Sequence, residues 1–146
     1  MRTRPNTKRI SQAVLAQMRA AATEAAKRAY CPYSRFPVGA AVLTMNGRIF
    51  SACNVENASY GLTVCAERNA IFQAVASRSQ RVVAVLIYTP TPRPAVPCGA
   101  CRQVINEFGP KATIYCVCDG KKELRISMTE LLKHAFGPQN LPRPWA

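Results

Sequence analysis

The chain has 146 residues, of which 49% are hydrophobic and 18% charged, a composition typical of one globular domain. No apolar run approaches the roughly 20 residues that cross a bilayer, and no signal peptide is evident, so we expect neither a membrane span nor export. Without export, the seven cysteines are expected to be reduced thiols in the cytoplasm, and their odd number argues against a complete disulfide framework.

The formal net charge of +13 can mark either a nucleic-acid-binding surface or an ordinary solvated surface. We favour the solvated surface, because four cationic residues lie in the first nine and the others are scattered without interleaved aromatic residues. One stretch is locally basic, since residues 68–106 contain five arginines and no acidic residue. Such surroundings would help to hold cysteines as thiolates.

We divide the chain into a basic flexible tail at 1–9, one domain at 10–138 and a C-terminal tail at 139–146. In the domain, Ser11 is a candidate N-cap of a helix whose apolar residues follow helical spacing. This helix should stop before Pro32, because proline disfavours helical geometry in the residue that precedes it.

A β-hairpin is predicted after this helix. An extended loop at 31–37 leads into a short strand at 38–43. The Asn46-Gly47 pair is a strong hairpin signal, and the chain should return as an antiparallel strand at 48–55.

The middle of the chain predicts two helices that flank a buried strand. Thr63 is a candidate N-cap of a helix from 64 to about 77. The continuous apolar run at 82–88 predicts a strand covered on both faces. The segment 89–97 contains four prolines and cannot be regular structure. The second helix should then run from Cys98 to about 109.

The C-terminal part predicts two strands, at 112–117 and 123–126, around a turn. Ser127-x-x-Glu130 has the pattern of a capping box for a last short helix to about Ala135. The alternation of strands and helices along the chain predicts an α/β layered sandwich.

Three cysteines have the spacing of metal ligands. Cys98 and Cys101 form a Cys-x-x-Cys directly after a proline, and Cys65 supplies a third thiol from a distant segment. All three fall near predicted helix N-termini, where the helix dipole favours a thiolate. A catalytic zinc site has three protein ligands and one water, whose pKa falls toward about 7, whereas a structural site has four protein ligands. The one histidine, His134, lies outside these motifs.

The residues next to the cysteines are candidates for supporting roles. Glu67 follows Cys65 by two positions and is the candidate proton carrier. Two positions along a helix rotate a side chain by about 200°, so Glu67 could reach the metal only from an open first turn. Arg68 and Gln103 are candidate hydrogen-bond donors to the sulfurs.

The remaining cysteines are interpreted as packing residues. Cys116-x-Cys118 alone has a metal-like spacing, but both residues fall on one face of a predicted strand, with no further ligand nearby. Cys31 and Cys53 belong to no ligand motif.

Cys65-Ala-Glu67 followed by Pro97-Cys98-x-x-Cys101 resembles the motif of the zinc-dependent nucleoside and nucleobase deaminases. The segment 30–40, Asn54-Val-Glu-Asn-Ala and Phe136-Gly-Pro further resemble the small, single-domain cytidine deaminases, over roughly residues 10 to 138. The resemblance implies a three-layer α/β/α sandwich with a central mixed five-stranded sheet, and a homotetramer with one zinc ion per subunit. It also implies hydrolytic deamination of cytidine and 2′-deoxycytidine to uridine and 2′-deoxyuridine, as in pyrimidine salvage.

The same resemblance implies roles for individual residues. Glu67 would take a proton from water, deliver it to N3 of the base and later protonate the departing amine. Asn54 and Glu56 would bind the 3′-hydroxyl of the sugar, and their side chains share a face if the chain stays extended there.

Further contacts with the substrate rest on the resemblance alone. Phe36 would pack on the pyrimidine ring, unless it belongs to the core, and Ala66 would contact the substrate. Tyr60 and Phe136 would reach the pocket of a neighbouring subunit. Val96 departs from the family pattern, because many relatives have a serine before Pro-Cys.

Three other functions stay open. Deamination of cytosine in DNA or RNA would suit the charge of +13. We do not expect a nucleic-acid partner, however, because nucleic-acid deaminases usually have His-x-Glu and Glu56 would repel a phosphate. A modified cytosine nucleoside is a further possible substrate. A non-enzymatic structural zinc module would need a fourth protein ligand.

Overall fold

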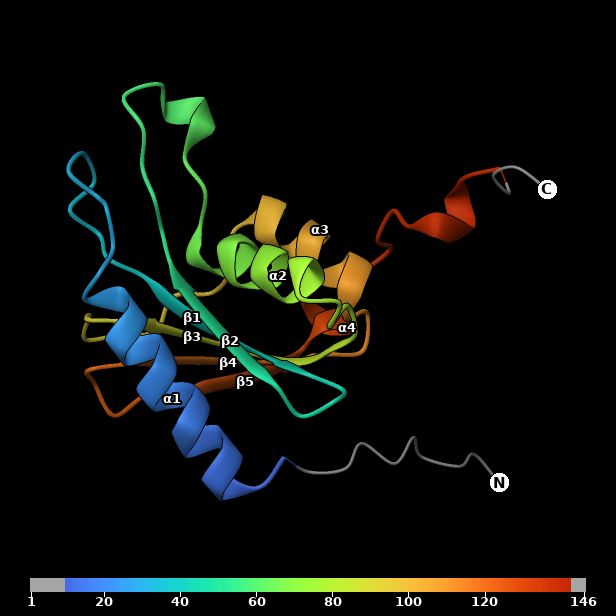
Figure 1. Ribbon diagram of the computed structural model, residues 1–146, viewed down its shortest axis with the longest axis horizontal. Helices are drawn as coiled ribbons and strands as arrows, with labels where there is room; N and C mark the ends of the chain where they lie inside the picture. Colours follow the sequence, from blue (N-terminus) through green and yellow to red (C-terminus); the bar gives the residue numbers. More distant parts are fainter. Residues whose placement is uncertain (1–9, 143–146) are drawn as a thin grey trace.

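The structure is a computed structural model and describes residues 10–142. A five-stranded mixed sheet lies between α1 on one face and α2, α3 and α4 on the other (Figure 1). This arrangement confirms the three-layer α/β/α sandwich that the resemblance implied. The predicted tail at 1–9 and the end of the predicted C-terminal tail lie outside the described residues.

The elements follow one another in the predicted order. The strands are β1 (Gly39–Thr44), β2 (Ile49–Cys53), β3 (Val82–Thr89), β4 (Thr113–Cys118) and β5 (Leu124–Ser127). The α-helices are α1 (Gln12–Ala26), α2 (Ala66–Ala76), α3 (Gly99–Phe108) and α4 (Met128–Leu131), with short 3-10 turns at Tyr60–Leu62 and Pro138–Asn140. No helix in this part of the chain is both long and apolar enough to cross a bilayer.

The topology brings distant segments to one edge of the sheet. The strand order is β2-β1-β3-β4-β5, and β3 and β4 are parallel while the other neighbours are antiparallel. Gly39 pairs with Cys53 of β2 and with Tyr88 of β3, and Thr89 pairs with Cys118 of β4. The segments that leave β2 and β3 therefore start from the same edge, and they lead directly into α2 and α3.

Each face of the sheet has its own hydrophobic layer, because side chains alternate along a strand. In β1, Ala40 and Val42 pack toward α2, while Ala41 and Leu43 pack toward α1. The helices cover both layers with small or aliphatic residues, such as Ala22 in α1. Burying a large aliphatic side chain contributes about 1.5–3 kcal/mol, so one layer fixes α2 and α3 against the sheet and the other fixes α1.

Two predicted helix boundaries are wrong. The helix predicted from 64 to about 77, which is α2, begins at Ala66 rather than at Val64, because Val64 pairs with Val55 as an isolated antiparallel bridge and is held extended. Thr63 closes the preceding 3-10 turn and is not the cap. The last helix ends at Leu131 rather than near 135, and His134 has a left-handed φ of 53°, which an α-helix cannot continue through.

Candidate metal centre and adjoining cavity

The three candidate ligands converge where α2 and α3 begin. Cys65 is the N-cap residue of α2, Cys98 is the N-cap residue of α3, and Cys101 lies in the first turn of α3. Their sulfur atoms all lie within 4.8 Å of one another, and those of Cys65 and Cys98 are 3.8 Å apart. Zinc–sulfur bonds of about 2.3 Å at tetrahedral angles separate two sulfurs by about 3.8 Å. The cluster therefore fits a zinc ion.

One cation, the Arg68 guanidinium, lies beside this cluster and favours a thiolate at Cys65. The Arg68 guanidinium donates through Nη2 to the Thr63 carbonyl and to Cys65 Sγ, at 3.4 Å and 3.6 Å. Its Nε is buried and has no hydrogen-bond partner among the described residues. A hydrogen bond from Cys101 and then the contact with Arg68 lower the pKa of Cys65 to about 5. The pKa of Cys101 is raised in turn, mainly because its thiol donates to Cys65.

Gln103 makes a different contact from the one expected. Its Nε2 donates to the Phe136 carbonyl at 2.9 Å, and no hydrogen bond from it to a sulfur is found in the described structure. Gln103 therefore fastens the segment after α4 to α3. The expected contact between Arg68 and a sulfur is present.

Glu67 lies in the first turn of α2 and is only 4% exposed. It lines the same cavity as Cys65 and Cys98. The rotation of about 200° expected between positions 65 and 67 does not apply, because an N-cap residue has extended backbone and stands outside the helical spiral. Burial raises the pKa of Glu67 to about 7.

The cavity beside the cysteines has a volume of about 360 Å³. Its walls come from four parts of the chain: the start of α2 with Glu67, the loop after β3 with Val96, the segment before β1 with Phe36, and Asn54 after β2. A larger cavity of about 640 Å³ lies beside α1 and α2, but it contains none of the candidate metal ligands. The smaller cavity is therefore the candidate active site, because Cys65, Cys98 and Glu67 line it.

Asn54 is buried and holds the wall that carries Phe36. Its Oδ1 accepts from the Val38 amide at 2.8 Å, and its Nδ2 donates to the Phe36 carbonyl at 2.9 Å. Each amide atom retains a further hydrogen-bonding site, since Asn offers two N–H donors and two oxygen lone pairs. Asn54 can therefore both position Phe36 and contact a ligand.

Glu56 lines a second cavity that adjoins the one beside the cysteines. It borders a small cavity of about 220 Å³ that shares the lining residues Ser34 and Thr63 with the main one. Its carboxylate accepts from the Ser34 hydroxyl and from the amides of Tyr33 and Ser34 at 2.9 Å and 3.2 Å. These bonds, led by that from the hydroxyl, lower the pKa of Glu56. The carboxylate is thus oriented and charged.

The remaining candidates lie in different environments. Phe36 is 41% exposed and belongs to the cavity wall rather than to the core. Tyr60 lines the small cavity next to Glu56 and is 74% exposed. Ala66 is fully buried in the layer between α2 and the sheet. Phe136 is 57% exposed and does not line the cavity of its own chain.

One residue that the sequence did not single out ties the centre together. Arg102 donates through Nε to the Pro97 carbonyl at 2.9 Å and through Nη1 to the Leu131 carbonyl at 3.2 Å. It therefore fixes the chain immediately before Cys98 against both α3 and the end of α4. The one feature of the sequence that could have indicated this role is the position of Arg102 directly after the ligand Cys101.

Comparison with known proteins agrees with this geometry. Residues 13–117 match the family model of the cytidine and deoxycytidylate deaminase zinc-binding region. The cytidine deaminase of Halalkalibacterium halodurans is 45% identical over 121 residues, which cover 82% of this chain and 92% of that protein. The cytidine deaminase of Mycobacterium tuberculosis is 41% identical over 126 residues, which cover 86% and 92%. The crystal structure of the Burkholderia pseudomallei cytidine deaminase is similar with a TM-score of 0.80 and 41% identity, over 87% of this chain and 100% of that one.

Proposed function

The chain belongs to the cytidine and deoxycytidylate deaminase family, and from this membership we propose that it hydrolyses cytidine and 2′-deoxycytidine to uridine and 2′-deoxyuridine with release of ammonia, as a step of pyrimidine salvage. One observation carries the proposal: the buried carboxylate of Glu67 lines the same cavity as the sulfurs of Cys65 and Cys98. A zinc-activated water and a proton carrier are the two requirements of this reaction.

Cys65, Cys98 and Cys101 would hold the zinc ion. Among residues 10–142 this centre offers three protein ligands rather than four, which favours a catalytic site over a structural one. When bound, zinc acts as a Lewis acid that lowers the pKa of water to about 7. The N-termini of α2 and α3 and the Arg68 guanidinium offset the charge of the thiolates.

Glu67 moves the protons. Its carboxylate accepts one proton from the attacking water and delivers it to N3 of the pyrimidine ring while the hydroxide adds to C4. It then transfers the proton of the new C4 hydroxyl to the amino group, which leaves as ammonia while the C4 carbonyl forms. Burial brings the pKa of this carboxyl to about 7, which suits a group that both accepts and donates protons at neutral pH.

The sugar would lie between Asn54 and Glu56. Ser34 and the neighbouring amides lower the pKa of Glu56, so that its carboxylate stays charged and accepts a hydrogen bond from the 3′-hydroxyl. A 3′-phosphate would be repelled by the same charge. This charge supports a free nucleoside as substrate rather than a nucleic-acid strand, in spite of the net charge of +13.

The proposal includes a homotetramer in the cytoplasm. Tyr60, Leu62, Phe72 and Phe136 expose between 48% and 74% of their surface, which is high for large apolar side chains. In the tetramer, Tyr60 and Phe136 would contact the cavity of a neighbouring subunit. Free cysteines suit a reducing compartment. Light scattering tests the assembly, and a monomeric mass would remove these roles from Tyr60 and Phe136.

The decisive experiment compares substrates and metal content together. Purified protein should contain one zinc ion per chain and should release ammonia from cytidine and 2′-deoxycytidine, but not from a cytosine-containing oligonucleotide. Ammonia from the oligonucleotide alone would identify a nucleic-acid deaminase. Turnover of 5-substituted cytidines only would indicate a modified nucleoside. Stoichiometric zinc without any turnover would indicate a structural zinc module.

A further inference from the structure

One wall of the cavity is formed by a loop that has few backbone hydrogen bonds of its own. The loop at 89–97 contributes Thr89, Ala95 and Val96 to the lining, directly before Cys98. Its four prolines have no amide N–H, so the loop cannot form a continuous ladder of backbone hydrogen bonds. Its internal bonds lie within residues 89–93, where the Thr91 amide donates to the Thr89 carbonyl at 2.8 Å and the Thr91 hydroxyl donates to the Arg93 carbonyl at 2.7 Å. The position of the wall must therefore depend on neighbouring segments.

The turn between β4 and β5 holds the first half of this loop. The Asp119 amide donates to the Thr91 carbonyl at 3.1 Å, and the Tyr88 hydroxyl donates to Asp119 Oδ1 at 2.6 Å. Gly120 packs directly on the loop, since a Cβ added at this glycine would lie 2.2 Å from the Pro92 carbonyl oxygen. Only a residue without a side chain fits this contact.

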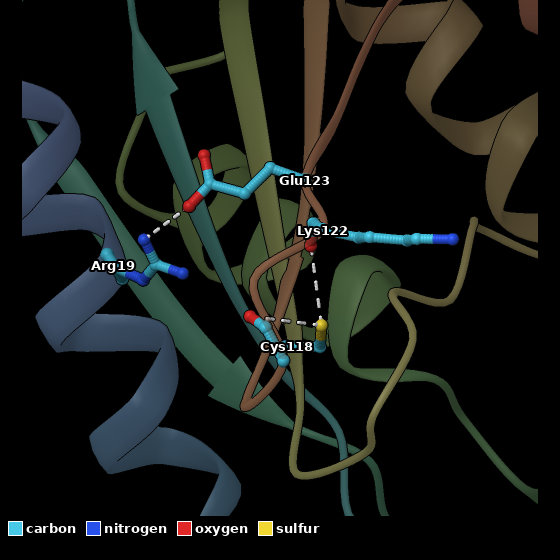
Figure 2. A network of polar contacts seen from close by, with 5 residues as sticks. Arg19, Cys118, Lys122 and Glu123 are labelled. Carbon is cyan, nitrogen blue, oxygen red and sulfur yellow. Dashed lines mark hydrogen bonds and ion pairs between the residues drawn. The ribbon is translucent and has the colours of Figure 1, made fainter.

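Two further sets of contacts hold the turn between β4 and β5, as Figure 2 shows. Cys118 Sγ donates to the carbonyls of Gly120 and Lys122, at 3.7 Å and 3.4 Å. On the other side, Arg19 of α1 forms an ion pair with Glu123 at 2.6 Å. This pair is half exposed and contributes little energy, but the thiol contacts are buried and fix the shape of the turn.

The far end of the loop is held separately, by Arg102 at the Pro97 carbonyl. Ala95 and Val96 therefore lie between two segments that are held by other parts of the chain, Thr91–Pro92 and Pro97. Asp119 and Gly120 do not line the cavity, and neither belongs to the metal ligands.

We infer that the Asp119–Gly120 turn is a positioning element that sets the width of the substrate cavity, and thereby the affinity for the nucleoside, through its contacts with Thr91 and Pro92. This inference rests on the proposed function. The turn contacts the first half of the loop, whereas the metal ligands and Glu67 lie at the starts of α2 and α3.

Gly120→Ala tests the inference, with Gly109→Ala as its matched control. At Gly109 an added Cβ would lie 2.7 Å from the Val82 carbonyl oxygen, which is a similar backbone clash at the opposite edge of the sheet. Gly120→Ala should raise KM for cytidine and lower kcat/KM roughly 10- to 100-fold, with full zinc content and a smaller change in kcat. Gly109→Ala should lower thermal stability but leave KM unchanged.

Hydrogen exchange supplies a readout that needs no substrate. In Gly120→Ala, the amide of Asp119, which donates to the Thr91 carbonyl, should exchange faster than in the wild type, whereas in Gly109→Ala it should not. Tyr88→Phe removes one hydroxyl without adding volume, and should raise KM roughly two- to tenfold. It serves as the test if Gly120→Ala does not fold.

The outcomes separate the two proposals. Turnover of cytidine by the wild type with an unchanged KM in both Gly120→Ala and Tyr88→Phe would overturn this inference alone, as would an equal rise of KM in Gly109→Ala. Absence of cytidine turnover in the wild type would overturn the proposed function. Unchanged exchange in Gly120→Ala would show that the turn does not hold the loop.

Discussion

Two groups of cysteines in this chain have the same side chain and opposite environments. Cys65, Cys98 and Cys101 lie at the N-terminal ends of helices, and the thiol of Cys101 together with the Arg68 guanidinium lowers the pKa of Cys65 to about 5. Cys116 and Cys118 lie inside β4, and burial raises the pKa of Cys116 to about 12. The first group gathers three sulfurs at one point beside a cation and can bind a metal ion, whereas the buried Cys116 keeps its proton. The position of a cysteine within its secondary structure therefore decides its chemistry.

Removing one of the ligands should have the largest effect. Cys98 is exposed, so Cys98→Ala should fold as the wild type does. It should nevertheless lose most bound zinc and all measurable deamination, because two thiolates do not complete the site. Metal analysis and an ammonia assay on the folded variant check this expectation. Full zinc content with normal turnover would remove Cys98 from the ligand set.

Glu67→Gln should separate metal binding from proton transfer. The amide has nearly the same shape but cannot accept or release the proton, so turnover should fall by roughly 10²- to 10⁴-fold. Zinc content should equal that of the wild type, because Glu67 is not among the sulfur ligands. If the variant lost its metal instead, Glu67 would have a structural role at the centre.

Arg68→Gln should weaken the centre without abolishing it. The substitution removes the cation next to Cys65 Sγ, and loss of such supporting partners typically lowers metal affinity by 10- to 100-fold. Competition with a chelator at fixed free zinc measures this change. Arg48→Gln is a suitable control, because Arg48 contacts Ser77, Ser79 and Phe50 and no cysteine. An equal loss of affinity in the control would argue against a local effect of Arg68.

Cys116→Ala should have the smallest effect on function. Removing a buried sulfur leaves a small cavity, so the free energy of unfolding should fall by about 1 kcal/mol. Zinc content and kcat/KM should stay as in the wild type. Denaturant unfolding with parallel kinetics checks both quantities. A loss of zinc in this variant would erase the distinction between the two groups of cysteines.

Much of this fold could be predicted from local patterns. The Ser11 cap, the Asn46-Gly47 hairpin and the capping box at Ser127 all occur where the sequence placed them, because each depends on contacts within a few residues. The start of α2 could not be predicted in the same way. Val64 pairs with Val55, a contact that closes a loop, and this tertiary pairing shifts the cap to Cys65.

In the candidate site too, features that depend on local sequence could be predicted, whereas those that depend on tertiary contacts could not. The spacing of the three cysteines predicted the cluster, since the ligand motif lies in the sequence itself. The contacts that fix it depend on how α3, α4 and the loop after β3 pack. Arg102 reaches the carbonyls of Pro97 and Leu131, and Gln103 binds the Phe136 carbonyl rather than a sulfur. Backbone carbonyls leave no signal in a sequence, which is why these partners could not be foreseen.

The four prolines of the loop at 89–97 have a consequence for how such a protein can diverge. A segment with so few amide donors tolerates exchange of its side chains, because few hydrogen bonds depend on its exact course. Its anchor is a hairpin turn that touches neither nucleobase nor zinc. Descendants of this scaffold could therefore acquire new substrate preferences through mutations in that turn, while the machinery for deamination is inherited intact.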